Sequence, residues 1–218
     1  MKRIARWGLL ASFLSFLSLD SQPKDFSKAF LIEPLVDSPG KNVGSDFNGD
    51  GIQDMLFASD QNDDGPGDNA GAAYVLFGTP LRGAQTYRLD GAGVSVTILG
   101  KADSDRLGAS LASAGDINSD GFDDIVVGAF NNDDIASNSG AAYVIFGRPT
   151  FFSTTIQMNG VGGDVTLLGK ALDDAFGQIV GGAGDLNGDG FDDLVVGTPQ
   201  NDDGASQNAG AAYLLYGA

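Results

Sequence analysis

The residues best suited to chemistry in this chain are three acidic loops of nine residues. They read DFNGDGIQD from Asp46 to Asp54, DINSDGFDD from Asp116 to Asp124, and DLNGDGFDD from Asp185 to Asp193. Each has Asp at positions 1, 5 and 9, Asn at position 3, and at position 6 a glycine that permits a sharp turn because it adopts positive φ at little cost. The side chains at positions 1, 3 and 5 can then converge on one point. Their negative charges repel one another there unless a cation lies between them.

The donor set predicts that this cation is calcium. Carboxylates, an amide and a backbone carbonyl at position 7 form an all-oxygen site, which suits Ca²⁺ better than Mg²⁺, which retains its water, or Zn²⁺, which prefers nitrogen and sulfur. The loops are not EF-hands, because position 12 holds Phe57, Val127 or Val196 instead of Glu. The alternative is a set of metal-free Asx turns on a solvated surface, but three copies in register favour the metal site. We expect the apolar side chains at positions 2 and 7 to face the core.

The composition excludes several kinds of catalytic site. The chain has no His and no Cys, so Ser-His-Asp and Cys-His mechanisms, His- or Cys-ligated zinc and disulfides are all absent. Paired carboxylates could still perform glycosidase chemistry, at Asp63–Asp64, Asp133–Asp134 or Asp202–Asp203. These pairs recur at the same place in each repeat, which favours an architectural role, and we predict that the chain is not an enzyme. The net charge of −17, with no basic stripe, argues against a nucleic-acid partner.

The N-terminus predicts export. Basic residues at Lys2, Arg3 and Arg6 precede an apolar stretch from Trp7 to Leu19, which is too short to span a bilayer but suits a signal peptide. We expect a signal peptide at residues 1–21, no transmembrane span, and a secreted or cell-surface protein, either extracellular or periplasmic. An amphipathic helix or membrane-dipping anchor is the alternative, because no clean cleavage site follows.

Two markers show that the chain is built from repeats of about 70 residues. The acidic loops start at Asp46, Asp116 and Asp185, and the motif GAAY starts with the same spacing at Gly71, Gly140 and Gly210. Within the second repeat we expect four strands, at residues 124–130, 141–147, 154–160 and 164–170.

The first two expected strands are continuously apolar, so both faces of each sheet must be covered. Stacked four-stranded sheets predict an all-β β-propeller, with a sandwich or solenoid as the alternative. We expect a repeat region at 22–218, with blades at approximately 43–100, 101–169 and 170–218.

Two segments resemble the FG-GAP repeats of the integrin α-subunit propeller and of bacterial surface proteins. They are LGASLASAGDINSDGFDDIVVGAF from Leu107 and FGQIVGGAGDLNGDGFDDLVVGTP from Phe176, in which Phe176–Gly177 matches the FG part and Leu107–Gly108 is a close variant. The resemblance extends from about Val43 to the end of the chain. It implies that calcium is structural and that partners bind elsewhere on the propeller. The calcium ligands that it implies are Asp46, Asn48, Asp50, Ile52 (carbonyl) and Asp54; Asp116, Asn118, Asp120, Phe122 (carbonyl) and Asp124; and Asp185, Asn187, Asp189, Phe191 (carbonyl) and Asp193.

The repeat count leaves the closure of the propeller open. The first copy has no FG lead-in, and three repeats are fewer than the four to eight blades of a closed ring. Outer strands for the third copy could come from Asp25 to Val36. Alternatively, the chain is part of a longer protein with further blades, self-associates, or forms an open arc.

The function that these features predict is a secreted or cell-surface calcium-binding module for adhesion or for recognition of a protein or glycan. The alternative is an accessory or truncated domain of a secreted hydrolase, of phospholipase or polysaccharide-degrading type.

Overall fold

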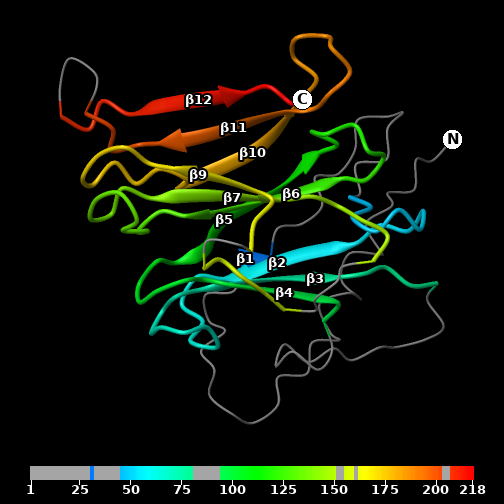
Figure 1. Cartoon of the computed structure of the whole chain (residues 1–218), viewed down its shortest axis with the longest axis horizontal. Helices are drawn as coiled ribbons and strands as arrows, with labels where there is room; N and C mark the ends of the chain where they lie inside the picture. The colour runs from blue at the N-terminus through cyan, green and yellow to red at the C-terminus, as the bar shows by residue number, and fades with distance from the viewer. Residues whose placement is uncertain (1–29, 32–44, 81–93, 151–154, 160–161, 203–206) are drawn as a thin grey trace, which may run out of the picture.

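The computed structural model describes residues 30–31, 45–80, 94–150, 155–159, 162–202 and 207–218, which form strands, turns and loops without a helix. Three sheets lie one above another (Figure 1). The predicted signal peptide at residues 1–21 lies outside the described residues, and the described part has no helix that could cross a membrane. The strands are β1 (Phe30–Leu31), β2 (Met55–Ser59), β3 (Ala72–Leu76), β4 (Val96–Leu99), β5 (Leu107–Gly115), β6 (Asp124–Ala129), β7 (Ala141–Ile145), β8 (Thr155–Gln157), β9 (Val165–Leu168), β10 (Ile179–Gly184), β11 (Asp193–Thr198) and β12 (Ala211–Leu215).

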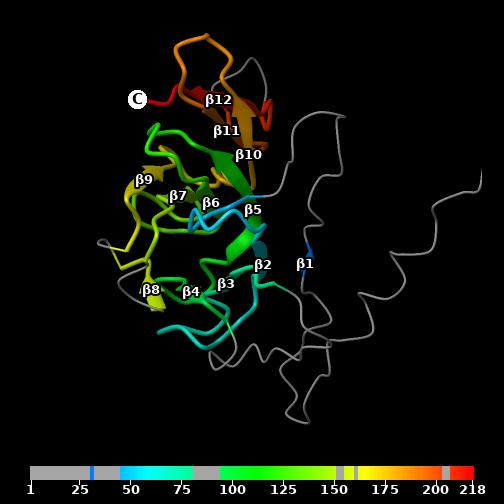
Figure 2. The same cartoon turned by 90° about the vertical axis from the view of Figure 1, so that its right-hand side faces the viewer.

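The three sheets repeat one plan. Their strand orders are β1-β2-β3-β4-β8, β5-β6-β7-β9 and β10-β11-β12. The GAAY tyrosine faces the same position of the preceding strand in each sheet, since Tyr74, Tyr143 and Tyr213 pair with Phe57, Val127 and Val196. The predicted all-β architecture of propeller blades is therefore confirmed, and the described sheets form an open stack, not a closed ring (Figure 2).

The first strands of the second and third sheets were not predicted. β5 precedes the second acidic loop and pairs with β6, and β10 precedes the third and pairs with β11. The acidic loops are thus hairpin turns between the first and second strands, where Gly115 pairs with Asp124 and Gly184 with Asp193. β5 consists largely of Gly, Ala and Ser, and β10 ends in GGAG. These residues have little intrinsic β preference, so both strands were interpreted only as lead-in to the loops.

The expected strand at 154–160 belongs to a different sheet from the one predicted. Its described part, β8, does not join β7 and β9 but pairs in parallel with β4 of the first sheet, with Ile156 opposite Ile98. The Met158 amide then donates to the Leu99 carbonyl oxygen at 3.0 Å, and the Met158 side chain is buried between the first and second sheets. The sequence pattern indicated a strand correctly but carried no information about which edge it would join.

The expected use of Asp25 to Val36 as an outer strand of the third copy is also wrong for the part that the structure describes. β1 pairs antiparallel with β2, with Phe30 opposite Ala58. It therefore occupies in the first sheet the place that β5 and β10 occupy in the other two.

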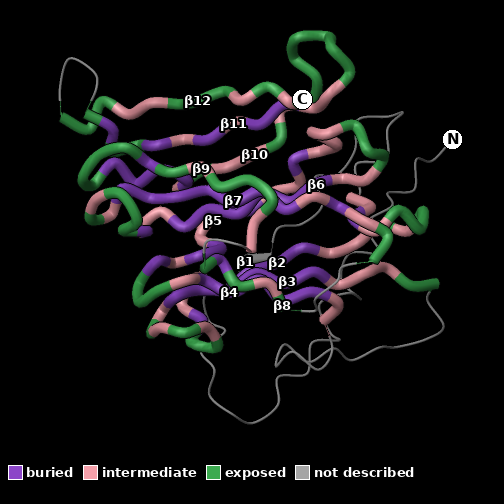
Figure 3. The backbone as a smooth tube through the Cα atoms, in the orientation of Figure 1, coloured by how far each residue is buried: buried purple, intermediate pink, exposed green. Residues whose placement is uncertain are grey.

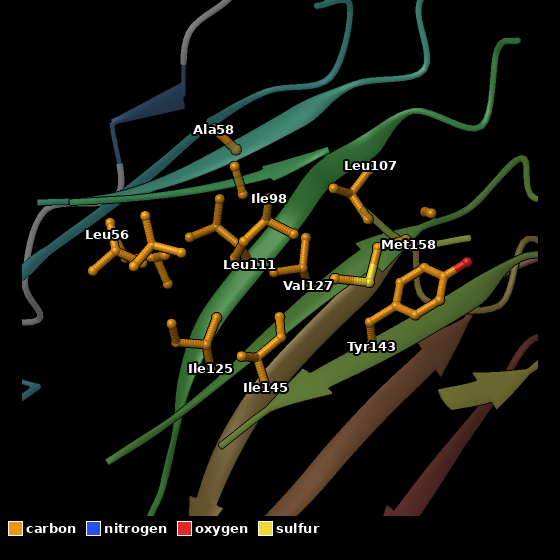
Figure 4. Close-up of a cluster of buried hydrophobic side chains, with 14 of the residues drawn as sticks. Leu56, Ala58, Ile98, Leu107, Leu111, Ile125, Val127, Tyr143, Ile145 and Met158 are labelled. Atoms are coloured by element: carbon orange, nitrogen blue, oxygen red, sulfur yellow. The ribbon is translucent and has the colours of Figure 1, made fainter. Parts of the chain in front are cut away.

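Two layers of apolar side chains hold the stack together. One layer lies between the first and second sheets and includes Leu56, Ile98, Leu111 and Ile125 (Figure 4). Another lies between the second and third sheets and includes Val126, Val144, Phe176, Leu194 and Val196. β6 is buried at every position, as its continuous apolar sequence predicts. Burial is less complete in the third sheet, where the central residues of β12 are exposed (Figure 3).

The GAAY glycine joins each sheet to the next. Gly71 forms an isolated parallel bridge with Leu107, and Gly140 forms one with Phe176. A Cβ atom at Gly140 would lie 2.1 Å from the Phe176 carbonyl oxygen, and the residue has a φ of 82°. Both the close approach and the positive φ require glycine here. This contact fixes the first strand of one sheet against the third strand of the sheet before it.

Candidate metal sites

The three acidic loops lie at one edge of the stack. Each loop leads into the second strand of its sheet, β2, β6 or β11, and the loops lie at the right-hand side of Figure 1 in cyan, green and orange. The polar loops that connect the second and third strands lie at the opposite edge. The sheet topology thus separates the acidic loops from the paired aspartates of the polar loops.

In the first loop, the side chains at positions 1, 3 and 5 lie together. Asp46 Oδ1 accepts the Asp50 amide hydrogen at 3.1 Å, and Asn48 Oδ1 accepts the same hydrogen at 3.0 Å. Asp46 Oδ2 accepts the Gly51 amide at 2.7 Å, and Asp50 Oδ2 accepts Asn48 Nδ2 at 3.2 Å. Because two side-chain oxygens share one donor, positions 1 and 3 must lie on the same side of the loop as position 5.

The second and third loops repeat this geometry. Asp116 Oδ1 and Oδ2 accept the amides of Asp120 and Gly121, at 3.0 and 2.9 Å. Asp185 makes the equivalent bonds to position 5 at 3.2 Å and to position 6 at 3.0 Å.

Positive φ occurs at two positions of every loop. The position 6 glycines have φ values of 81°, 93° and 96°, as the turn prediction requires. Position 4 is also left-handed in all three loops, with φ values of 72°, 56° and 79°, even where it is Ser119. That second left-handed residue was not foreseen, although Gly49 and Gly188 at the same position indicate it.

The ninth aspartate clamps the loop to the end of the third strand. One of its oxygens accepts the amide of position 2 in its own loop, and the other accepts the amide of the glycine that follows the third strand. Asp124 bonds in this way to Ile117 at 3.0 Å and to Gly147 at 2.8 Å. Asp54 accepts the amides of Phe47 and Gly78 in the same way, and Asp193 accepts those of Leu186 and Gly217, at 2.8 to 3.1 Å. Each carboxylate oxygen has a second lone pair, so these bonds leave acceptor capacity for a cation.

The loops concentrate negative charge. Burial raises the pKa of Asp124 to about 7, and the charges of Asp120 and Asp116 add to this effect, while the amides of Gly147 and Ile117 oppose it. Burial likewise raises the pKa of Asp54 to about 6, with contributions from Asp46 and Asp50. A cation in the loop would favour the ionised carboxylates.

The donor chemistry fits calcium. The atoms that the structure brings together in each loop are two carboxylates and one amide, all oxygen donors of the kind that Ca²⁺ prefers. In the described ranges, no three acidic side chains come close enough to enclose a metal ion by themselves. A calcium site in these loops would therefore draw on the amide and on backbone oxygen as well as on carboxylates.

The apolar positions of the loops have different neighbours from one copy to the next. At position 2, Phe47 is 1% exposed between the first and second sheets, Ile117 packs between the second and third, and Leu186 is 60% exposed. At position 7 the side chains are half-buried, and the Phe122 ring lies against Gly49 of the preceding loop. Only position 2 thus faces the core as expected, and only where another sheet covers it.

The paired aspartates of the polar loops have a structural use. The first member of each pair accepts the amide of a left-handed asparagine later in the same loop. These bonds join Asp63 to Asn69, Asp133 to Asn138 and Asp202 to Asn208, at 2.5 to 2.6 Å. The predicted architectural role of these residues accounts for their recurrence.

A buried carboxylate outside the acidic loops was missed. Asp105, 3% exposed, accepts Asn132 Nδ2 at 3.3 Å and the Ala102 amide at 3.2 Å, and burial raises its pKa to about 6. The third copy repeats this pair in Asp174 and Asn201. Its recurrence in the segment before the FG position was a signal that could have identified it.

The comparisons with known proteins agree with this geometry. The FG-GAP repeat model matches residues 107–145 and 176–215, which run from β5 to β7 and across β10, β11 and β12. The chain carries FG-GAP repeats. The first acidic loop lies outside both matched ranges, in line with its missing FG lead-in.

Among curated proteins, the chain is similar to integrin α subunits, which confirms the resemblance. It is 29% identical over 159 residues to integrin alpha-PS5 of Drosophila melanogaster, and the aligned region covers 72% of this chain and 14% of the relative. It is 25% identical over 176 residues to integrin alpha-4 of Xenopus laevis, with coverage of 75% and 15%. It is 29% identical over 160 residues to integrin alpha-5 of Xenopus laevis, with coverage of 70% and 14%. The chain thus spans about one seventh of the length of these relatives.

Proposed function

We propose that this chain is a calcium-stabilised recognition module, secreted or displayed at the cell surface, whose partner is a protein or a glycan. The observation that carries the calcium part is the threefold repetition of one donor geometry at one edge of the stack. The FG-GAP repeats and the similarity to integrin α subunits support the recognition part. The apolar stretch at residues 7–19 supports export.

In this proposal the acidic loops bind calcium and the ion is structural. The side chains at positions 1, 3 and 5 are the primary ligands, and the carbonyl of position 7 and the ninth carboxylate complete the set. The calcium ion supplies positive charge that offsets the repulsion between carboxylates. The chain's own part is to orient these oxygens through the amides of positions 4 to 7 and to anchor the first and second loops through the side chains at position 2, Phe47 and Ile117.

The hydrogen bonding also favours a module over an enzyme. The carboxylates of the acidic loops and the first member of each aspartate pair accept backbone amides that hold their loops in shape. These groups have an architectural task, so the proposed partner is bound and not transformed.

Calcium titration calorimetry on the whole chain tests the first half of the proposal. The variant Asp50→Asn/Asp120→Asn/Asp189→Asn removes one charge from each loop and keeps an oxygen that accepts the position 7 amide. Its matched control, Asp63→Asn/Asp133→Asn/Asp202→Asn, removes the same number of charges from the polar loops. The wild type and the control should bind calcium and the first variant should not; equal binding by all three proteins would contradict the assignment.

A binding screen tests the second half. Immobilised protein is exposed to panels of extracellular matrix proteins and of glycans, with calcium and with EDTA. Saturable binding that is lost in EDTA is the expected result. A calcium-loaded, folded protein that binds nothing in either panel, but turns over generic esterase, phosphodiesterase or glycosidase substrates, would overturn the recognition role.

A further inference from the structure

The eighth residue of an acidic loop reaches the first residue of the preceding loop. Asp123 Oδ2 accepts the Asp46 amide at 2.9 Å, and the Asp123 amide donates in return to the Asp46 carbonyl oxygen at 3.4 Å. The next junction repeats the pair, with Asp192 Oδ2 accepting the Asp116 amide at 3.0 Å and the Asp192 amide donating to the Asp116 carbonyl oxygen at 3.1 Å. Both peptide groups of position 1 are therefore held by the following repeat.

A second contact strengthens each junction. The Phe47 carbonyl oxygen accepts the Arg148 amide at 2.9 Å, and the Ile117 carbonyl oxygen accepts the Ala218 amide at 3.0 Å. At the first junction the Phe122 ring also packs so closely on Gly49 that a Cβ atom there would lie 2.3 Å from the ring. The backbone at positions 1 and 2 of the first and second loops is thus held by the repeat that follows, and at the first junction position 4 is held as well.

These contacts fall on the residue that organises the site. Position 1 accepts the amides of positions 5 and 6 and is the proposed ligand that faces positions 3 and 5. The residue that holds its backbone, Asp123, stands between Phe122 and Asp124, which are the proposed position 7 and position 9 ligands of the next loop. An ion that fixes those two ligands also fixes Asp123.

The carboxylate at position 8 also carries charge between two loops. Asp123 interacts electrostatically with Asp46 of the first loop and with Asp116 of the second. With a cation in each loop, the same carboxylate would lie between two positive charges and reduce their mutual repulsion. The hydrogen bonds of the position 8 carboxylate and its negative charge therefore both favour calcium in two neighbouring loops at once.

We infer that Asp123 and Asp192 are positioning residues that couple neighbouring calcium sites, so that occupation of one loop raises the affinity of the loop before it. This inference rests on the proposed function. Linkage requires the effect to be reciprocal, and couplings between sites are commonly fivefold or more in affinity. Such coupling can arise when one ion orders a segment that both sites use, here residues 122–124 or 191–193.

A double-mutant cycle, in which calcium affinity is measured at one loop at a time, tests the inference. The Gly51 amide donates to Asp46 Oδ2 in the first loop, so its ¹H–¹⁵N resonance follows calcium binding there in the full chain. We expect Asp120→Asn, which disables the second loop, to lower the calcium affinity of the first loop about fivefold or more. Asp123→Ala should do the same, and the double variant should lose no more than either single change.

The matched control is Gln53→Ala, which alters position 8 of the first loop, where the described residues contain no earlier loop to hold. It should leave the affinity read at Gly51 unchanged. If Asp123→Ala does not fold, the same measurement on Asp192→Ala, read at the Gly121 amide of the second loop, decides the question.

Two different failures are distinguishable. A wild-type Gly51 resonance that calcium does not move would contradict the proposed calcium site itself. A resonance that moves with the same affinity in wild type, Asp120→Asn and Asp123→Ala would leave the calcium site intact and overturn the coupling.

Discussion

The replacement of Phe47 by alanine should destabilise the fold far more than the same replacement at the equivalent loop position in the third copy. Phe47 is 1% exposed in the core between the first and second sheets, whereas Leu186 is 60% exposed. Removal of a buried phenylalanine side chain costs about 3–5 kcal/mol, and a change at an exposed position costs about 0.5 kcal/mol or less. Ile117, which is half-buried between the second and third sheets, should give an intermediate loss of about 1–2 kcal/mol.

Urea unfolding followed by circular dichroism measures these three losses, with every protein in the same excess of calcium. The expected order of destabilisation is Phe47→Ala, then Ile117→Ala, then Leu186→Ala. With about 2–4 °C per kcal/mol for a domain of this size, Phe47→Ala should lower the melting temperature by about 10 °C. A loss below about 1 kcal/mol for Phe47→Ala, or an equal loss for Leu186→Ala, would refute the stacking of the first loop against the second sheet.

Three further predictions follow from the packing and burial. Gly140→Ala should cost at least about 2 kcal/mol more than Gly121→Ala when both are measured in EDTA, because a Cβ atom at Gly140 meets the Phe176 carbonyl oxygen at 2.1 Å, whereas Gly121 has nothing within 4 Å; equal costs would contradict the close junction. Met158→Ala should cost about 2–4 kcal/mol in urea unfolding, since Met158 is 1% exposed between two sheets, and a neutral result would mean that β8 does not dock on β4. Burial raises the pKa of Asp105 from 3.8 to about 6, so the folded state binds the proton more tightly and wild-type stability is lost as pH rises through this range. The stability of Asp105→Asn relative to wild type should therefore increase by up to about 2–3 kcal/mol between pH 4 and 7, and a pH-independent difference would contradict the buried carboxylate.

The sequence predicted the repeating parts of the fold because their signals are local. The acidic loops carry their own turn glycine, and strands such as Asp124–Ala129 are apolar without interruption, so the loop position, the strand and the burial of both faces all follow from neighbouring residues. The GAAY motif marked the third strand of each sheet, although its contact with the next sheet became clear only from the bridge between Gly140 and Phe176.

The parts that the sequence did not predict depend on partners far away in the chain. β5 has no β-branched residue and the last four residues of β10 are GGAG, so both are held as strands by pairing with β6 and β11. β8 was recognised as a strand, but its partner β4 lies in another repeat. The same holds at the candidate sites, because nothing in the order of residues showed that Asp124 would bond to Gly147, or that Asp123 would hold Asp46.

The most direct test of the calcium-stabilised module is the melting temperature of the whole chain in about 1 mM Ca²⁺ and in EDTA. A site with a Kd near 0.1 mM, which is in the range of extracellular modules, contributes about 1.4 kcal/mol at that concentration, so three sites contribute about 4 kcal/mol. The melting temperature should therefore be about 8–16 °C higher in calcium, and the position 5 triple variant should lose this difference while the polar-loop control keeps it. Identical melting temperatures in calcium and in EDTA would contradict the central role given to the three acidic loops.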